Sequence, residues 1–209
     1  MEKLKLLHVG CGPKTKKQTT NFFNNDNWEE TRIDVDTSCK PDVVGSMTDM
    51  NMFANSTFDA IYSSHNFEHL FAHEAEIAAK EFFRVLKPTG YLLLLCPDIL
   101  AACKAVYEKG PDSVLYSTEN GTPISPIDVV YGWGRAIKNG NEFMAHKYGY
   151  SEKTLISVFK KAGFSNMAST SRKGYFDIVL LACRESLYNE NDMELNNKNI
   201  KELFTNHLK

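Results

Sequence analysis

A glycine-rich turn follows the first apolar run of the chain, and it is the first place where ligand chemistry is expected. The stretch LLHVGCGPKTK, residues 6–16, places Gly10 and Gly12 on either side of a single cysteine. Glycine allows positive φ angles and lets a ligand approach the main chain closely. The turn could therefore hold a phosphate, the sugar and amino acid of a larger cofactor, or no ligand at all.

Two phosphate-binding motifs fit this turn poorly. A P-loop places a lysine and then Ser or Thr directly after a later second glycine, and this chain has no such spacing. A dinucleotide-binding turn has a third glycine where Thr15 stands, and it presents a helix N-terminus to the pyrophosphate. The segment that follows here begins with lysines and has no clear helix cap. A nicotinamide cofactor stays open as an alternative that the pattern does not favour.

S-adenosylmethionine, which has no phosphates, makes other demands, and the sequence meets them in order. A carboxylate at the end of the second expected strand can accept hydrogen bonds from both ribose hydroxyls, and Asp34 or Asp36 stands there. Ser46 and Met47 follow the third strand, where the adenine edge is read. The sulfonium cation requires a loop without positive charge after the fourth strand, and residues 62–70, YSSHNFEHL, contain no Lys or Arg.

The elements that must position these residues read as alternating strands and helices. Short apolar runs predict strands over residues 5–9, 31–36, 41–46, 58–64, 91–97 and 175–184. Helical spacing predicts helices over residues 73–86, 99–109 and 151–162, with Asp98 and Ser151 as caps of the last two. The polar stretch 14–30, anchored by Phe22, Phe23 and Trp28, reads as irregular or briefly helical. Such alternation favours a parallel sheet that binds ligands beyond the carboxyl ends of its strands.

Five stretches of the sequence resemble the class I S-adenosylmethionine-dependent methyltransferases, and most closely their small type 11 branch. The stretches are LHVGCGP, RIDVD, FDAIYSSHNFEHL, FFRVLKPTGYLLLLCPD and HKYGYSEKTLISVFKKAGF. Together the resemblance covers residues 4–100 and 146–183. It implies a Rossmann-like three-layer α/β sandwich with a seven-stranded, mostly parallel sheet whose last strand is antiparallel.

The resemblance also implies which residues surround S-adenosyl-L-methionine and its product, S-adenosyl-L-homocysteine. Register with the family selects Asp34 as the ribose acid and leaves Asp36 as the second choice. The full set of expected cofactor contacts is Val9, Gly10, Cys11, Gly12, Asp34, Val35, Ser46, Met47, Ser63, Ser64 and His65. The chain departs from the family at His8, where an acid is frequent, and near Lys14, where a third glycine is frequent.

The expected reaction is methyl transfer from S-adenosylmethionine to an oxygen or nitrogen of a small molecule or glycan. An in-line displacement depends mainly on alignment and on exclusion of water, so a catalytic base is needed only for some acceptors. The candidates for a direct catalytic role are His65, His146 and Tyr148. A non-catalytic S-adenosylmethionine-binding or interaction protein on the same fold is the alternative hypothesis.

A metal site is not expected. His65, Glu68 and His69 have the i, i+3, i+4 spacing of a helical metal site. The family, however, uses the EH pair as a structural helix start, so His69 is expected to be a half-buried histidine with its hydrogen bonds satisfied. The five cysteines form no C-x-x-C pair and are odd in number, which disfavours a zinc site or a disulfide framework.

The chain reads as a single methyltransferase domain over residues 1–184, with an inserted lid or acceptor segment at 110–150 and a polar tail at 185–209 that could form a helix. Tyr131 and Trp133 in the insertion could stack on a planar or sugar acceptor. The net charge of −2 argues against nucleic acid as a partner. No apolar run approaches the length of a membrane span and no signal-peptide pattern is seen, so a cytoplasmic monomer or homodimer without a membrane partner is expected.

Overall fold

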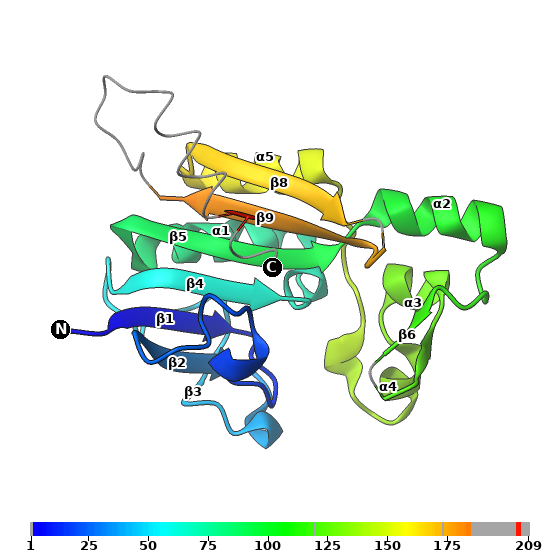
Figure 1. The fold of residues 1–209 in the computed structure, drawn as a ribbon, viewed down its shortest axis with the longest axis horizontal. Helices are drawn as coiled ribbons and strands as arrows, with labels where there is room; N and C mark the ends of the chain where they lie inside the picture. Colours follow the sequence, from blue (N-terminus) through cyan, green and yellow to red (C-terminus); the bar gives the residue numbers. More distant parts are fainter. Residues whose placement is uncertain (1, 119, 173, 185–203, 206–209) are drawn as a thin grey trace.

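The computed structural model describes residues 2–118, 120–172, 174–184 and 204–205, and its centre is a seven-stranded sheet (Figure 1). The strand order is β3-β2-β1-β4-β5-β9-β8. The strands are β1 Leu4–Val9, β2 Trp28–Asp34, β3 Val43–Val44, β4 Phe58–Ser64, β5 Leu86–Pro97, β8 Asn166–Arg172 and β9 Asp177–Cys183. All neighbours pair parallel except β9, which is antiparallel to both β5 and β8. The predicted fold class, with its antiparallel last strand, is confirmed.

The strand order reverses at β1. This strand pairs with β2 on one side and with β4 on the other, although β4 follows β2 and β3 in sequence. The connections therefore leave β1 in opposite directions and open a crevice beyond its carboxyl end. The turn that starts at Gly10 lies at this point.

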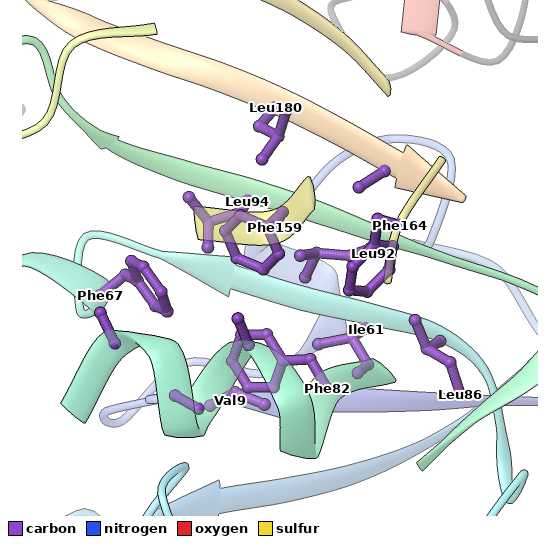
Figure 2. Close-up of a cluster of buried hydrophobic side chains, with 14 of the residues drawn as sticks. Val9, Ile61, Phe67, Phe82, Leu86, Leu92, Leu94, Phe159, Phe164 and Leu180 are labelled. Carbon is purple, nitrogen blue, oxygen red and sulfur yellow. The ribbon is translucent and has the colours of Figure 1, made fainter. Parts of the chain in front are cut away.

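Two helices, α1 Ala72–Val85 and α5 Glu152–Ala162, cover one face of the sheet, behind it in Figure 1. Figure 2 shows Phe82 of α1 and Phe159 of α5 beside side chains of the strands, and both rings are fully buried. Burial of such a side chain contributes about 1.5–3 kcal/mol. The apolar face predicted for 73–86 is therefore the face that fixes α1 on the sheet.

The other face of the sheet is covered in part by the irregular segment between β1 and β2. Phe23 is fully buried, and its ring meets the rings of Trp28 and Tyr62 at 5.0 and 6.0 Å. One 3₁₀ turn, η1 at Lys16–Gln18, is the helical structure in this segment. Phe204 packs against the same aromatic cluster. The expected aromatic anchoring is therefore confirmed, with aromatic rings rather than a long helix filling this layer.

The helix ends agree with the predicted caps. α2, Ile99–Lys109, begins after Asp98, whose carboxylate accepts hydrogen bonds from the amides of Leu100 and Ala101. Ser151 caps α5, and Gly163 ends it with a φ of +114°. Strand β8 was not predicted, because its sequence NMASTSR has neither an apolar run nor clear alternation. It lies at the edge of the sheet and is half-buried along its whole length.

The segment between α2 and α5 holds short elements at the carboxyl end of the sheet (Figure 1). They are β6 Tyr116–Ser117, β7 Pro123–Ile124, α3 Pro126–Tyr131, α4 Gly134–Lys138 and the 3₁₀ turn η4 Glu142–Met144. Within the described part of the chain, no helix combines the length and the apolar character needed to cross a membrane. The tail beyond residue 184, for which the sequence offers a helix, lies outside the described residues except for helical Phe204 and Thr205.

Candidate functional site

A cavity of about 760 Å³, here called the main cavity, opens beyond the carboxyl ends of β1, β2 and β4. The sheet side of its wall consists of His8, Gly10, Cys11, Gly12, Pro13, Lys14, Asp34, Asp36, Cys39, Tyr62, Ser64, His65, Asn66 and His69. The opposite wall comes from the 110–150 segment and consists of Trp133, Asn141, Glu142, Phe143, Met144 and Lys147. Its size suits a drug-sized or cofactor-sized ligand.

The glycine turn, Gly10 to Pro13, has the backbone that its sequence requires. Gly10 and Gly12 have φ angles of +60° and +53°, a region that other residues rarely adopt. A Cβ added to Gly12 would meet no atom within 4 Å, so this position borders open space. Cys11 is buried between the two glycines, and this burial raises the pKa of its thiol to about 12. The turn therefore offers bare backbone to a ligand, and its cysteine is a neutral spacer.

Asp34 is tied to the glycine turn. Its Oδ2 accepts a hydrogen bond from the amide of Gly12 at 2.8 Å, and its Oδ1 accepts one from the amide of Asp36 at 2.9 Å. An ionised carboxylate can accept about four hydrogen bonds, so both oxygens keep capacity for a ligand. Asp34 thus shapes the turn and also presents a carboxylate to the main cavity.

Asp36 lies on the same wall of the main cavity, but its carboxylate is engaged in capping a neighbouring turn. It is half-buried and caps the 3₁₀ turn η2, Thr37–Cys39, by accepting a hydrogen bond from the amide of Ser38 at 2.8 Å. Hydrogen bonds from Ser38 lower the pKa of this carboxyl group. Of the two acids considered for the ribose, Asp34 is the one that is held against the glycine turn.

Asn66 belongs to the site and was not singled out by the sequence. Its Nδ2 donates to the carbonyl of Val9 at 2.7 Å, and its Oδ1 accepts from the hydroxyl of Ser63 at 2.6 Å. These bonds join the end of β1 to the loop after β4, directly beneath the glycine turn. The sequence shows only that Asn66 is a polar residue between YSSH and FEHL. No local pattern indicates which strand its side chain contacts.

The structure brings only part of the predicted contact set to the main cavity. Six of the expected residues line it, namely Gly10, Cys11, Gly12, Asp34, Ser64 and His65. Five are placed elsewhere, namely Val9, Val35, Ser46, Met47 and Ser63. Val9 and Ser63 are buried, and the Ser63 hydroxyl is used by Asn66. Ser46 bonds the hydroxyl of Thr48, and Met47 packs against the core.

His65 stands where the main cavity meets a smaller one of about 140 Å³, here called the side cavity. Its Nε2 lies 3.6 Å from Oδ2 of Asp177, and its Nδ1 lies 3.8 Å from Oε1 of Glu68. Asp177 is already engaged by the guanidinium of Arg172. The φ angle of His65 is +54°, which places its backbone in the left-handed region. Strained backbone of this kind clusters at functional sites.

His146 and Tyr148, the other catalytic candidates, have different surroundings. His146 lines the side cavity, where burial lowers the pKa of its imidazole. Tyr148 lines neither the main nor the side cavity and packs against the ring of Tyr150 at 5.0 Å. Trp133 borders both cavities, whereas Tyr131 is exposed and borders neither.

Comparison with known proteins agrees with this geometry. Residues 7–94 match a family model described as a methyltransferase domain. A search of curated protein sequences gives no significant match. The match spans less than half of the chain, and together with the fold it supports a class I S-adenosylmethionine-dependent methyltransferase. A methyltransferase domain is an enzyme domain, and S-adenosyl-L-methionine is the cofactor that such a domain on this fold uses.

Solved structures of low sequence identity share the fold. A protein of Pyrococcus horikoshii superposes with a TM-score of 0.60 at 16% identity, covering 87% of this chain and 82% of that one. A Methanosarcina mazei protein described as a SAM-dependent methyltransferase gives 0.53 at 16% identity, over 87% and 92%. The Burkholderia thailandensis 1,6-didemethyltoxoflavin-N1-methyltransferase, solved with its substrate and S-adenosylhomocysteine, gives 0.51 at 11% identity, over 88% and 72%.

Proposed function

We propose that the protein methylates an oxygen or nitrogen of a small molecule or glycan, and that cofactor and acceptor meet in the main cavity. The observation that carries this proposal is the composition of the cavity wall. One side consists of the glycine turn and Asp34, and the other consists of aromatic and polar residues of the 110–150 segment. Two ligands of different chemistry can therefore be held face to face.

The sheet side fits S-adenosylmethionine. Open space beside Gly12 leaves room for a ligand against the backbone. Asp34, with acceptor capacity on both oxygens, is the residue proposed to bind the two ribose hydroxyls. When bound, the cofactor supplies a methyl group on a sulfonium centre. The contribution of Asp34 and the glycine turn is to orient it and to exclude water.

The insertion side fits an acceptor of limited size. Trp133 and the exposed ring of Phe143 can stack on a planar or sugar ring. Lys147 is the cation on this wall, and its ammonium group lies 4.7 Å from the ring centre of Phe71. The 110–150 segment is thus proposed as the acceptor wall of a single domain. The Burkholderia neighbour, solved with a small-molecule substrate, supports an acceptor of this class.

The cofactor half of the proposal is tested by calorimetry with S-adenosylmethionine and S-adenosylhomocysteine. The parent protein should bind both, and Asp34→Asn should weaken binding by roughly 10- to 100-fold, because hydrogen bonds to a charged acceptor contribute about 1.5–3 kcal/mol. Asp36→Asn is the matched control and should change affinity little. The assignment of Asp34 would be wrong if the two variants lost affinity equally.

The acceptor half is tested by following S-adenosylhomocysteine formation over a panel of hydroxylated and amine-bearing small molecules and glycans. With an accepted substrate, Trp133→Ala and Phe143→Ala should raise the acceptor KM and leave cofactor affinity unchanged. A panel without any turnover, from a protein that binds the cofactor, would count against this acceptor class.

A further inference from the structure

Glu68 is a buried carboxylate in an unusual position. It lies in the 3₁₀ turn η3, Phe67–His69, and its side chain is 2% exposed. Neither of its oxygens has a hydrogen-bond partner among the described residues. A buried carboxylate without compensation is strongly disfavoured, and in folded proteins such groups are paired or coordinate metals. Asp177 nearby is paired with Arg172, but no Lys or Arg of the described chain forms an ion pair with Glu68.

Two histidines beside Glu68 have their ring orientation fixed by backbone carbonyls. Nδ1 of His69 lies 2.9 Å from the carbonyl oxygen of Ala145, and Nδ1 of His146 lies 3.0 Å from that of Val129. A carbonyl oxygen only accepts, so each Nδ1 carries the hydrogen and donates it. Each Nε2 is then left with a free lone pair. Metal-binding histidines are oriented by the same kind of bond on the second ring nitrogen.

The three side chains converge on one point. Each of Glu68, His69 and His146 offers one ligand atom, and these three atoms all lie within 4.8 Å of one another. Nε2 of His146 is 3.8 Å from Oε1 of Glu68. Ligands at about 2.0–2.2 Å from a metal lie roughly 3–4 Å apart, so small side-chain movements complete the set.

The backbone holds this arrangement together across a long stretch of chain. The amides of Lys147 and Tyr148 both donate to the carbonyl oxygen of Glu68, at 2.9 and 3.2 Å. The segment that carries His146 is therefore fastened directly to the turn that carries Glu68 and His69. The ligand set depends on tertiary contact, which is why the local EH motif alone did not predict it.

The cluster faces the space where an acceptor is expected. Glu68, His69 and His146 all line the side cavity, and His69 lines the main cavity as well. His65 borders both cavities and lies next to Glu68. A metal at this point would have protein ligands on one side and the cavity on the other.

We propose that Glu68, His69 and His146 bind a divalent transition metal such as Zn²⁺, with open coordination positions toward the cavities. Two imidazoles and one carboxylate with an open position are the ligand set of catalytic zinc and of non-haem iron sites. Building on the proposed methyl transfer, the metal binds a hydroxyl oxygen of the acceptor and lowers its pKa. The O–H proton leaves to solvent, the oxygen forms the new O–CH₃ bond, and the cofactor sulfur keeps the electron pair of the broken S–CH₃ bond.

The metal site is tested without cofactor or acceptor. The full chain, stripped with a chelator, is titrated with Zn²⁺ by competition against a chromophoric chelator, and Co²⁺ is added separately to record visible absorption. The expected result is one metal per chain, with Co²⁺ bands and a higher melting temperature on metal addition. Absence of stoichiometric binding by the parent protein would overturn the site.

The variants separate this site from adventitious binding. Glu68→Gln and His146→Ala should each weaken Zn²⁺ binding by more than roughly 10- to 100-fold. That smaller loss is typical when a residue that only hydrogen-bonds to a metal ligand is replaced. Exposed His73→Ala is the matched control and should bind Zn²⁺ as the parent does. Circular dichroism establishes that the metal-free variants are folded. Equal Zn²⁺ affinity in parent, Glu68→Gln and His146→Ala would contradict the ligand assignment.

The role in methyl transfer has its own readout. The metal-free enzyme should bind S-adenosylmethionine normally and lose turnover of a hydroxyl acceptor, and turnover should return with Zn²⁺. Unchanged turnover after complete metal removal would refute acceptor activation and leave the binding site itself intact. Failure of cofactor binding in the metal-loaded protein would instead count against the proposed function.

Discussion

A Cβ added to Gly10 would lie 2.4 Å from Nδ2 of Asn66, closer than real side chains approach one another. The same Nδ2 donates to the carbonyl of Val9 at 2.7 Å. Gly10 is therefore fixed by two independent constraints, a φ of +60° and an amide packed against its Cα. The turn at the end of β1 and the loop after β4 form one unit.

This relationship predicts different outcomes for the two glycines of the turn. Gly10→Ala should destabilise the protein by about 2–4 kcal/mol, because it adds a clash to the roughly 1–2 kcal/mol of left-handed strain. Gly12→Ala has the strain without the clash, so its cost should be about 1–2 kcal/mol. Urea unfolding of both variants measures the difference. Equal costs would show that Asn66 moves aside freely.

His8 and Glu30 form a largely buried pair, and the effects of replacing them on the free energy of unfolding should be strongly coupled. Nδ1 of His8 lies 2.8 Å from Oε1 of Glu30, and the two side chains are 3% and 11% exposed. His8→Leu should cost about 2–4 kcal/mol, because it leaves a poorly solvated carboxylate without its partner. In the double variant with Glu30→Leu, the total should be about 1–3 kcal/mol smaller than the sum of the single costs. A double-mutant cycle from urea unfolding tests this, and strict additivity would show that the contact contributes little.

Glu81 predicts a specific acid dependence of stability. Its carboxylate accepts hydrogen bonds from Arg84 and from the amide of Met50, and the Arg84 guanidinium lowers its pKa below the usual value. Since the folded pKa lies below the unfolded one, this contribution is complete above the unfolded pKa and is lost as the pH falls through the folded value. Glu81→Gln should thus cost about 1–2 kcal/mol at neutral pH and much less near pH 3.

The matched control for Glu81 is another carboxylate of α1. The side chain of Glu76 is 46% exposed and pairs with Lys161 across the surface at 2.8 Å. Glu76→Gln should show a much smaller difference between the two pH values, because solvent screens the pair. Chemical unfolding at several pH values measures both variants. A pH-independent cost for Glu81→Gln would exclude its ionised form as the source of stability.

The core between α1, α5 and the sheet predicts a large truncation effect. Phe159 is fully buried and stacks near Phe82 at a centroid distance of 6.4 Å. Phe159→Ala should cost about 3–5 kcal/mol through lost burial and a cavity. Ile77→Ala, on the exposed side of α1, should stay within about 0.5 kcal/mol. Thermal unfolding of the two variants tests whether this helix pair anchors the fold.

Much of the fold could be predicted from local patterns. The glycine turn, the caps at Asp98 and Ser151 and the apolar face of α1 depend on neighbouring residues, and all are found where the pattern indicates. β8 could not be predicted from NMASTSR. It is a half-buried edge strand, so its sequence lacks the apolar run that marks a strand buried on both faces.

The candidate site also has one part that the sequence predicts and another part that it does not. Gly10, Gly12 and Asp34 lie together because strand ends in a parallel sheet gather at one edge, a consequence of topology that the sequence indicates. Ser46 and Met47 follow β3 as expected, but they are not part of the main cavity wall. Their side chains are engaged by Thr48 and by the core. Local order along the chain does not reveal such competing contacts.

The sequence by itself determined the class of the fold and the end of the sheet where the proposed cofactor site lies, because periodicity, caps and glycine turns are local properties of the chain. Only the tertiary structure decided which polar groups share a buried space. It placed Asn66 under Gly10, and it brought His146 from beyond the insertion to Glu68 and His69. Such contacts form when distant segments close on one another, and their burial and hydrogen bonding are fixed by packing rather than by neighbouring residues.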